Sequence, residues 1–120
     1  MLNLDTKIVK NFVIRIFFAN FAGKITIKML KFISFGSGSS GNSYYLYTET
    51  DSLLIDVGVG IRTLKKHFHN YGLRFEDVHH ILITHDHADH VKSVGSLSTD
   101  YHLPVYTTRK VHQGIERNYC

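Results

Sequence analysis

The stretch ITHDHADH (residues 83–90) places three histidines and two aspartates within six positions, directly after an apolar segment. The preceding residues HHILIT (79–84) have the apolar, β-branched composition of a buried strand. From His90 to about Asp100, apolar side chains recur at helical spacing, which predicts a helix. The cluster is therefore expected in a loop that leaves the carboxyl end of a strand and enters a helix.

Such a cluster has the chemistry of a metal site. Imidazole nitrogens and carboxylate oxygens are ligands that zinc takes, and they also suit manganese and iron. In a loop, His85 and His87 can close on one metal while Asp89 and His90 turn toward a second. Two metals roughly 3.5–4 Å apart can polarise a carbonyl or phosphoryl oxygen. A solvated loop with accidental histidines is the alternative, and Asp86 is interpreted as a residue that shapes the loop.

The rest of the chain predicts an α/β fold in the order β-β-β-α-β-α-β-α. Alternating or continuous apolar runs predict the strands, and apolar residues at a helical period predict the helices. Gly72 is expected to cap the first helix at its C-terminus. The expected strands cover 29–36, 44–48, 52–58, 79–84 and 103–108, and the expected helices cover 61–71, 90–100 and 109–119.

Residues 1–28 differ in character from the rest of the chain. FVIRIFFANFAG (12–23) is apolar and follows Lys7 and Lys10, but Arg15 leaves its apolar run too short for a bilayer, which needs about 20 residues. It permits three interpretations: a secretory signal, a strand-forming or amphipathic extension packed on the domain, or upstream sequence from a mis-set start. We favour the third, because a strand pattern begins right after Met29. The predicted division is an extension over 1–28 and a partial domain over 29–120, with no membrane association.

Charge and cysteine content give little further guidance. Residues 1–31 carry six basic side chains and one acid, whereas residues 32–120 carry eight basic and nine acidic side chains. The main body therefore gives no charge argument for nucleic-acid binding. The one cysteine, Cys120, excludes a disulfide framework within the chain. The predicted compartment is the cytoplasm.

Two motifs together resemble a known family. THDHADH (84–90) resembles the His-x-His-x-Asp-His signature of the metallo-β-lactamase fold hydrolases. LLIDVG (53–58) resembles the second motif of that family, whose aspartate braces the metal loop. The longer stretches FISFGSGSSGNSYYL (32–46) and THDHADHVKSVGSLSTDYHLPVYTT (84–108) are similar to the YycJ/WalJ-type branch, regarded as metal-dependent nucleases or phosphodiesterases acting on DNA. The resemblance covers about residues 29–120.

The resemblance implies a dinuclear site that holds two zinc ions, with manganese or iron possible. His85 and His87 would bind the first ion, and Asp89 and His90 the second. Asp89 would also handle the proton of the attacking water. Asp56 would act behind the ligands, as an orienting partner worth about 10–100-fold in affinity or activity.

The same resemblance places the loop of residues 39–42 near the metals. Backbone N–H groups in such a loop could meet a phosphate oxygen, as anion-binding nests do. A plain β-turn is the alternative for this loop. Its residues are Ser39, Ser40, Gly41 and Asn42.

The sequence also departs from the family pattern. The family site takes a further histidine for the first metal, a bridging aspartate and a last histidine for the second, all downstream of the signature. Here only His102 and His112 follow, in contexts that do not match. The family fold is a four-layer αββα sandwich of two similar halves, and this chain corresponds to the N-terminal half. We therefore expect the N-terminal part of a hydrolase, a gene fragment or truncated product that is inactive without its C-terminal half or a second copy.

Three functions stay open from the sequence. The first is phosphodiester hydrolysis in nucleic acid by a dinuclear metal centre. The second is hydrolysis of a thioester or a lactam with the same metals, and the third is a non-catalytic metal-binding fragment. The serine-rich loop and the residues after His90 favour the first.

Overall fold

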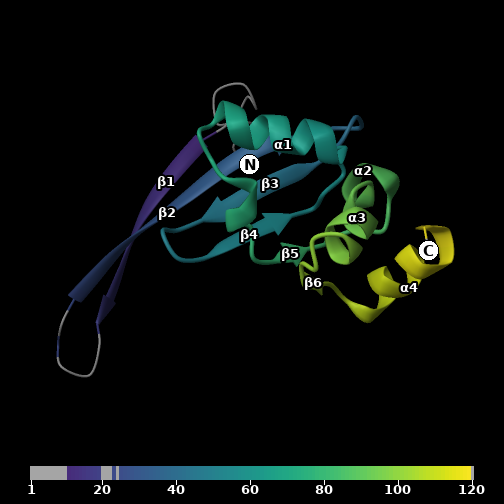
Figure 1. The fold of residues 1–120 in the computed structure, drawn as a ribbon. Coiled ribbons are helices and arrows are strands. Elements are labelled where there is room, and N and C mark those ends of the chain that lie inside the picture. The colour runs from purple at the N-terminus through teal and green to yellow at the C-terminus, as the bar shows by residue number, and fades with distance from the viewer. Residues whose placement is uncertain (1–10, 20–22, 24, 120) are drawn as a thin grey trace.

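The structure, a computed structural model, describes the backbone of residues 11–19, 23 and 25–119 and the side chains of residues 29–118. Within these residues the strands form one sheet in the order β1-β2-β3-β4-β5-β6 (Figure 1). The strands are β1 (Asn11–Ala19), β2 (Ile25–Gly36), β3 (Ser43–Tyr47), β4 (Ser52–Ile55), β5 (Ile81–Leu82) and β6 (Val105–Tyr106). The helices are α1 (Ile61–Asn70), the 3₁₀ helix η1 (Phe75–Asp77), α2 (Ala88–Val91), α3 (Val94–Thr99) and α4 (Arg109–Tyr119).

The sheet changes direction at β4. Strands β1 to β4 pair antiparallel in succession, whereas β4, β5 and β6 pair parallel. Parallel neighbours need a crossover connection. Helices α1 and η1 make the crossover from β4 to β5, and α2 and α3 make the one from β5 to β6. The carboxyl ends of the three parallel strands therefore meet at one edge of the sheet.

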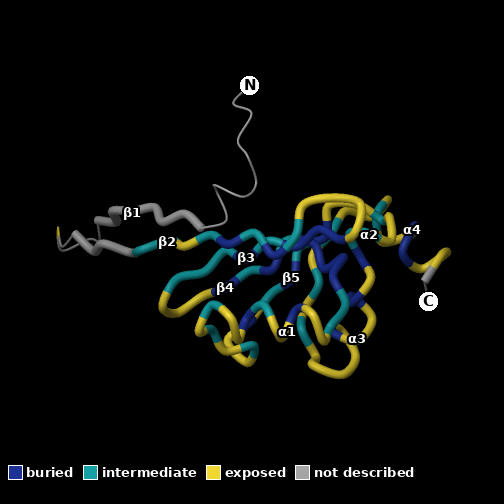
Figure 2. Tube along the Cα trace, turned by 90° about the horizontal axis from the view of Figure 1, so that it is seen from above, coloured by how far each residue is buried: buried dark blue, intermediate teal, exposed yellow. Residues whose placement is uncertain are grey.

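The core lies between the sheet and its helices. Helices α1 and α3 lie on the same side of the sheet (Figure 2). Fully buried apolar side chains come from both layers and include Leu54 and Ile81 from the sheet, Leu64 and Phe68 from α1, and Leu97 from α3. The apolar stripe of α1 thus does what its period predicts, since it packs on the sheet and leaves Lys65 and Lys66 exposed.

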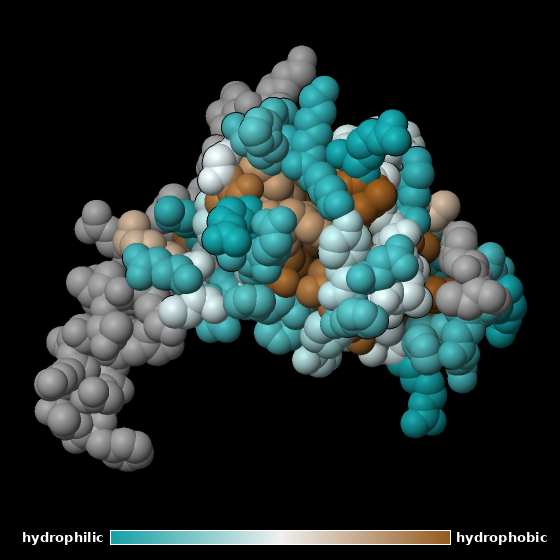
Figure 3. Space-filling view, in the orientation of Figure 1, coloured by the Kyte–Doolittle hydropathy of each residue, from teal (hydrophilic) through white to brown (hydrophobic). Residues whose placement is uncertain are grey.

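The surface that carries these helices is mixed. In Figure 3 hydrophilic side chains cover most of this face, and apolar surface shows between them near the centre.

The C-terminal cap predicted for α1 is confirmed. Gly72 has a φ of 69° and its N–H donates to the carbonyl of His69 over 3.0 Å.

Several predicted elements have other bounds in the structure. The strands predicted over 79–84 and 103–108 shorten to β5 (Ile81–Leu82) and β6 (Val105–Tyr106), and two further elements end early or divide. The strand predicted over 52–58 ends at Ile55, because Asp56 has a φ of 61° and turns the chain out of the sheet. The single helix predicted over 90–100 is wrong, because it divides into α2 and α3 at Ser93. The Ser93 N–H donates to the carbonyl of Val57 over 2.9 Å, and its hydroxyl donates to the carbonyl of Val59 over 2.5 Å. These long-range bonds take the place of helical ones at this residue.

The predicted boundary at residue 28 falls inside a strand. Strand β2 runs from Ile25 through Met29 to Gly36, and β1 pairs with it antiparallel from Asn11↔Ile33 to Ala19↔Ile25. Residues 1–10 of the predicted extension lie outside the described residues. The division into an extension and a domain stays a prediction.

The described helices include none with both the length and the apolar character that crossing a membrane requires.

Replacement of Leu64 tests how much the packing of α1 on the sheet contributes to stability. Leu64 is fully buried under the sheet, so Leu64→Ala should lower the free energy of unfolding by about 2–5 kcal/mol through lost burial and a cavity. Urea denaturation followed by circular dichroism measures this. Lys66→Ala, on the exposed face of the same helix, is the matched control and should change stability by less than about 0.5 kcal/mol. Equal losses in the two variants would show that α1 does not pack on the sheet through Leu64.

Candidate metal centre

The histidine cluster lies at the edge of the sheet where the ends of neighbouring strands meet. Residues His85 to His90 follow β5 and enter α2, and Asp56 follows β4. Because β4 and β5 are parallel neighbours, their carboxyl ends share one edge of the sheet. The loop of residues 37–42 precedes β3, which is antiparallel to β4 and so begins at the same edge. Three segments far apart in sequence therefore converge there.

Asp56 is the buried centre of this edge. It is 3% exposed, and its Oδ1 accepts a hydrogen bond from the Thr84 N–H over 2.8 Å. Its Oδ2 accepts from the Thr84 hydroxyl over 2.6 Å and lies 2.8 Å from Nδ1 of His90. An ionised carboxylate can only accept, so Nδ1 of His90 carries a proton, and in the neutral ring Nε2 then has the lone pair for another partner.

Thr84 extends the same network to the next histidine. Its hydroxyl has one proton, which goes to Asp56, so its oxygen accepts from Nδ1 of His85 over 2.8 Å. His85 is thus held in the same tautomer as His90, with Nε2 left for another partner. No role for Thr84 was predicted from the sequence. The available signal was a hydroxyl residue between a buried strand and a histidine cluster.

The side chains brought together suit a metal ion. Asp56, His85 and His90 each offer a ligand atom, and these atoms lie within 4.8 Å of one another. The rings of His85 and His90 are 4.5 Å apart between centroids. Both oxygens of Asp56 already accept hydrogen bonds. Asp56 is therefore better suited to orient His90 than to bind a metal directly. Two imidazoles with carboxylates beside them are a donor set that fits zinc, manganese or iron.

The remaining predicted ligands border this group. Asp89 is half-buried, with Oδ2 3.9 Å from Nε2 of His90. The ring of His87 is 6.3 Å from that of His85, and its side chain is 76% exposed. The rings of His85 and His90 are therefore closer than those of His85 and His87, and the binding of one ion by His85 and His87 stays a prediction.

Asn42 ties the serine-rich loop, residues 37–42, to the metal loop, residues 85–90. Its side-chain NH₂ donates to the Asp89 carbonyl over 3.1 Å and to Asp89 Oδ2 over 3.2 Å. The same amide closes its own loop, since Oδ1 accepts from the Gly38 N–H over 3.0 Å and Nδ2 donates to the Gly38 carbonyl over 2.9 Å. The Asn42 side chain therefore holds Asp89 and the loop together.

Two backbone N–H groups of this loop already have partners within the protein. The Gly41 N–H donates to the Gly38 carbonyl over 3.2 Å, and the Asn42 N–H donates to the Asp89 carbonyl over 2.8 Å. These two N–H groups are already used within the protein and do not suit a phosphate. The exposed residues Ser39 and Ser40 are left as the part of the loop that could meet one.

Glycines allow the converging backbones to touch. A Cβ on Gly58 would overlap the carbonyl group of Asp89. A Cβ on Gly41, which has a φ of 143°, would come within 2.7 Å of the Gly58 carbonyl oxygen. The Gly58 N–H donates to the Asn42 carbonyl over 2.9 Å. Side chains at either glycine would push the three segments apart.

The other histidines lie away from this group. His69, His79, His102 and His112 are exposed and His67 and His80 are half-buried, which agrees with their predicted surface or strand-edge positions. His112 pairs with Glu116 of the same helix over 3.3 Å.

Solved structures similar to this chain share the metallo-β-lactamase fold. A metallo-β-lactamase with a HARLDQ motif from Cronobacter sakazakii superposes with a TM-score of 0.60 at 18% identity, over 73% of this chain and 35% of that one. A β-lactamase from Chitinophaga pinensis gives a TM-score of 0.53 at 26% identity, over 63% of this chain and 28% of that one. The mixed sheet with its helices is thus an α/β part of that fold.

Sequence comparison identifies the family. The family described as "Anti-Pycsar protein Apyc1" matches residues 30–112, and the chain belongs to it. "Exodeoxyribonuclease YycJ" from Bacillus anthracis is 39% identical over 87 residues, which are 72% of this chain and 33% of the relative. "Exodeoxyribonuclease WalJ" from Streptococcus pneumoniae serotype 2 is 38% identical over 88 residues, 73% of this chain and 33% of the relative. This is a metallo-β-lactamase-fold protein of the YycJ/WalJ type that spans about a third of the length of these relatives.

Replacement of Gly58 tests the backbone contact beneath the metal loop. Gly58→Ala should lower the free energy of unfolding by about 1–3 kcal/mol, because the new Cβ has to displace the Asp89 backbone. Chemical denaturation gives the value. The control is Gly38→Ala in the serine-rich loop, where an added Cβ meets nothing within 4 Å. A Gly58→Ala protein as stable as this control would contradict the close approach of the two segments.

Proposed function

We propose that this chain carries the metal-binding part of a metal-dependent phosphodiesterase that acts on DNA. The observation that carries the proposal is the network from Asp56, which commits Nδ1 of His85 and of His90 and leaves both Nε2 atoms for a metal. The relatives at 38–39% identity are named exodeoxyribonucleases, and this supports DNA as the substrate. The predicted compartment remains the cytoplasm.

The ligands proposed for the ions are the four predicted from the sequence: His85, His87, Asp89 and His90. Zinc is the first choice of metal, with manganese or iron as substitutes. Asp56 is proposed to orient His90 directly and His85 through Thr84. When bound, a pair of such ions supplies positive charge that polarises a phosphoryl oxygen and acidifies a water molecule.

Asp89 is proposed to take the proton of the attacking water. Its carboxylate lies beside Nε2 of His90 and is held by the side-chain amide of Asn42. Both contacts are made by Oδ2, so the protein orients this oxygen of the carboxylate. Ser39 and Ser40, exposed on the neighbouring loop, are proposed to contact the substrate phosphate.

Further ligands are part of the proposal. Two ions shared by four side chains have two protein ligands each, fewer than the three or four of most zinc sites. We therefore propose that additional ligands come from polypeptide outside these residues, either a C-terminal half or a second copy of this chain.

Hydrolysis of a thioester or lactam is the second candidate. It is supported by the β-lactamase names of the structural neighbours, of which one is 26% identical. The exodeoxyribonuclease relatives are closer in sequence, so the phosphodiester reaction has the stronger support.

Metal content tests the ligand assignment. The purified chain, dialysed after loading with zinc, should hold at least one ion, and the double variant His85→Ala/His90→Ala should hold none, because it removes both oriented imidazoles. Elemental analysis per chain measures this. His112→Ala, which changes an exposed histidine on α4, is the control and should keep the full content. Equal metal in all three proteins would overturn the assignment.

Substrate assays distinguish the candidate reactions. The metal-loaded chain should release nucleotides from end-labelled linear DNA only when the further ligands are supplied, by a second copy of the chain at high concentration or by an added C-terminal half. EDTA and Asp89→Asn should each abolish this release, since they remove the ions and the proposed proton acceptor. Turnover of a chromogenic β-lactam or a thioester with DNA left intact would transfer the function to the second candidate. Bound metal without turnover of any substrate would favour a non-catalytic metal-binding role for this chain.

A further inference from the structure

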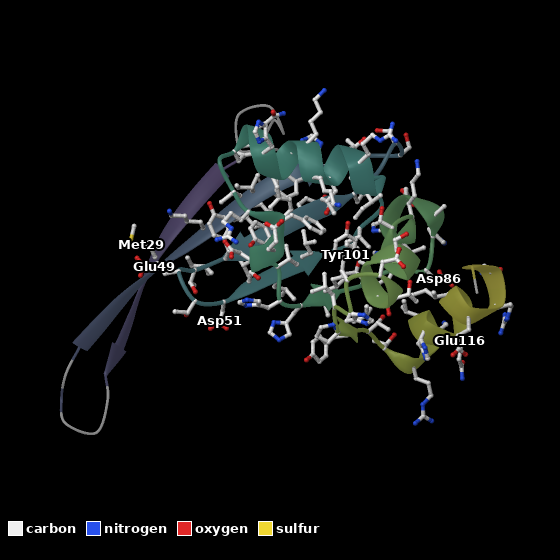
Figure 4. All side chains as sticks on the ribbon, viewed as in Figure 1. Met29, Glu49, Asp51, Asp86, Tyr101 and Glu116 are labelled. Carbon is white, nitrogen blue, oxygen red and sulfur yellow. The ribbon has the colours of Figure 1, made fainter. Side chains whose placement is uncertain are left out.

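Asp86 lies between two proposed ligands, and the proposed mechanism gives it no role. Its side chain is seated on helix α4, beside which it appears in Figure 4. A Cβ on Gly114 of that helix would overlap Oδ2 of Asp86 and would lie 2.7 Å from its Cγ. The carboxylate thus occupies the space that any side chain at Gly114 would fill.

Gly114 is an unusual residue for its position. It lies in the middle of α4 and is buried, although glycine is the poorest helix former after proline. A glycine inside a helix usually has a packing reason, and here the neighbour that needs the space is Asp86. The next residue, Ile115, is 6% exposed and anchors the helix in the core. Helix α4 therefore presents a fixed surface to the metal loop.

The ring nitrogen that lies near an oxygen is not the same in His87 as in His85 and His90. Nδ1 of His85 and of His90 are the nitrogens bonded to protein oxygens. In His87 it is Nε2 that lies beside a carboxylate, with Oδ1 of Asp86 at 3.9 Å. Nε2 of His90 lies equally far from Asp89, but Nδ1 of His90 is already bonded to Asp56. That separation is an ion-pair distance rather than a hydrogen bond, and such contacts are often long before the partner of a site is bound. The His87 ring is largely exposed and has room to turn.

We propose that Asp86 is the positioning residue of His87. Seated on Gly114, its carboxylate accepts a hydrogen bond from Nε2–H of His87, so that Nδ1 of His87 faces the metal. Each of the three histidines then has its own oxygen partner: Thr84 for His85, Asp86 for His87 and Asp56 for His90. This inference rests on the proposed metal-binding function, and it adds α4 to the elements that shape the site.

Two variants of Asp86 separate positioning from loop packing. Asp86→Asn keeps an oxygen acceptor and nearly the same shape, whereas Asp86→Leu keeps a similar bulk over Gly114 and removes the acceptor. Co²⁺ titration measures both the affinity and the visible absorption spectrum of the bound ion. Asp86→Asn should bind Co²⁺ within about threefold of the unaltered chain, and Asp86→Leu should bind about 10–100-fold more weakly with an altered spectrum. The melting temperatures of the metal-free proteins should agree.

A second pair of variants tests the seat on α4. Gly114→Ala should weaken Co²⁺ binding about tenfold, the low end of the effect of outer-sphere partners. In the Asp86→Ala background the same change should have almost no effect, because the side chain it displaces is absent. Gly95→Ala in α3, where an added Cβ meets nothing within 4 Å, is the control and should bind Co²⁺ as the unaltered chain does.

The outcomes keep the two proposals apart. An unaltered chain that binds no Co²⁺ would overturn the metal-binding function itself. An unaltered chain that binds, with Asp86→Leu matching it in affinity and spectrum, would overturn only the role of Asp86. Equal losses from Gly114→Ala with and without Asp86 would show that the glycine acts on the site by another route.

Discussion

Three hydrogen bonds converge on the buried carboxylate of Asp56, and the arrangement of the metal loop depends on them. A buried carboxylate is costly unless its oxygens are paired, so Asp56 keeps Thr84 and His90 close to it. The same bonds decide the tautomers of His85 and His90, because a carboxylate cannot donate. One residue at the end of β4 thereby sets the direction in which two histidines of the neighbouring segment offer their lone pairs. Its left-handed backbone, with a φ of 61°, ends the strand and turns the side chain into this position.

Close backbone contact is the second constraint. Gly41 and Gly58 let the serine-rich loop, the end of β4 and the metal loop lie against one another without intervening side chains. Hydrogen bonds from Asn42 and to Val57 then cross between these segments. Ser93 also forms hydrogen bonds across these segments, and its bonds to Val57 and Val59 account for the break between α2 and α3. The metal loop is thus shaped by bonds to other segments more than by its own helical preference.

Hydrogen bonds within the protein accordingly organise the site. His85 and His90 are oriented from beneath by the sheet, and Asp89 is held from one side by Asn42. Helix α4 borders the loop on another side through Asp86. His87 is a proposed ligand whose side chain is 76% exposed. These contacts support the proposal that this chain carries part of a metal centre.

The sequence by itself determined the type of most elements and the chemistry of the cluster. The apolar periods predicted the strands and α1, and the density of histidines and aspartates after an apolar strand predicted metal ligands, because both signals are local. The partners of those ligands are not local. Thr84 was visible in the sequence, but its bond to Asp56 depends on β4 and β5 being parallel neighbours. The contact of Asp86 with Gly114 likewise depends on how α4 returns to the sheet. Only the tertiary structure decided these pairings, because hydrogen-bond geometry and close packing are set by distances between segments that a residue pattern does not contain.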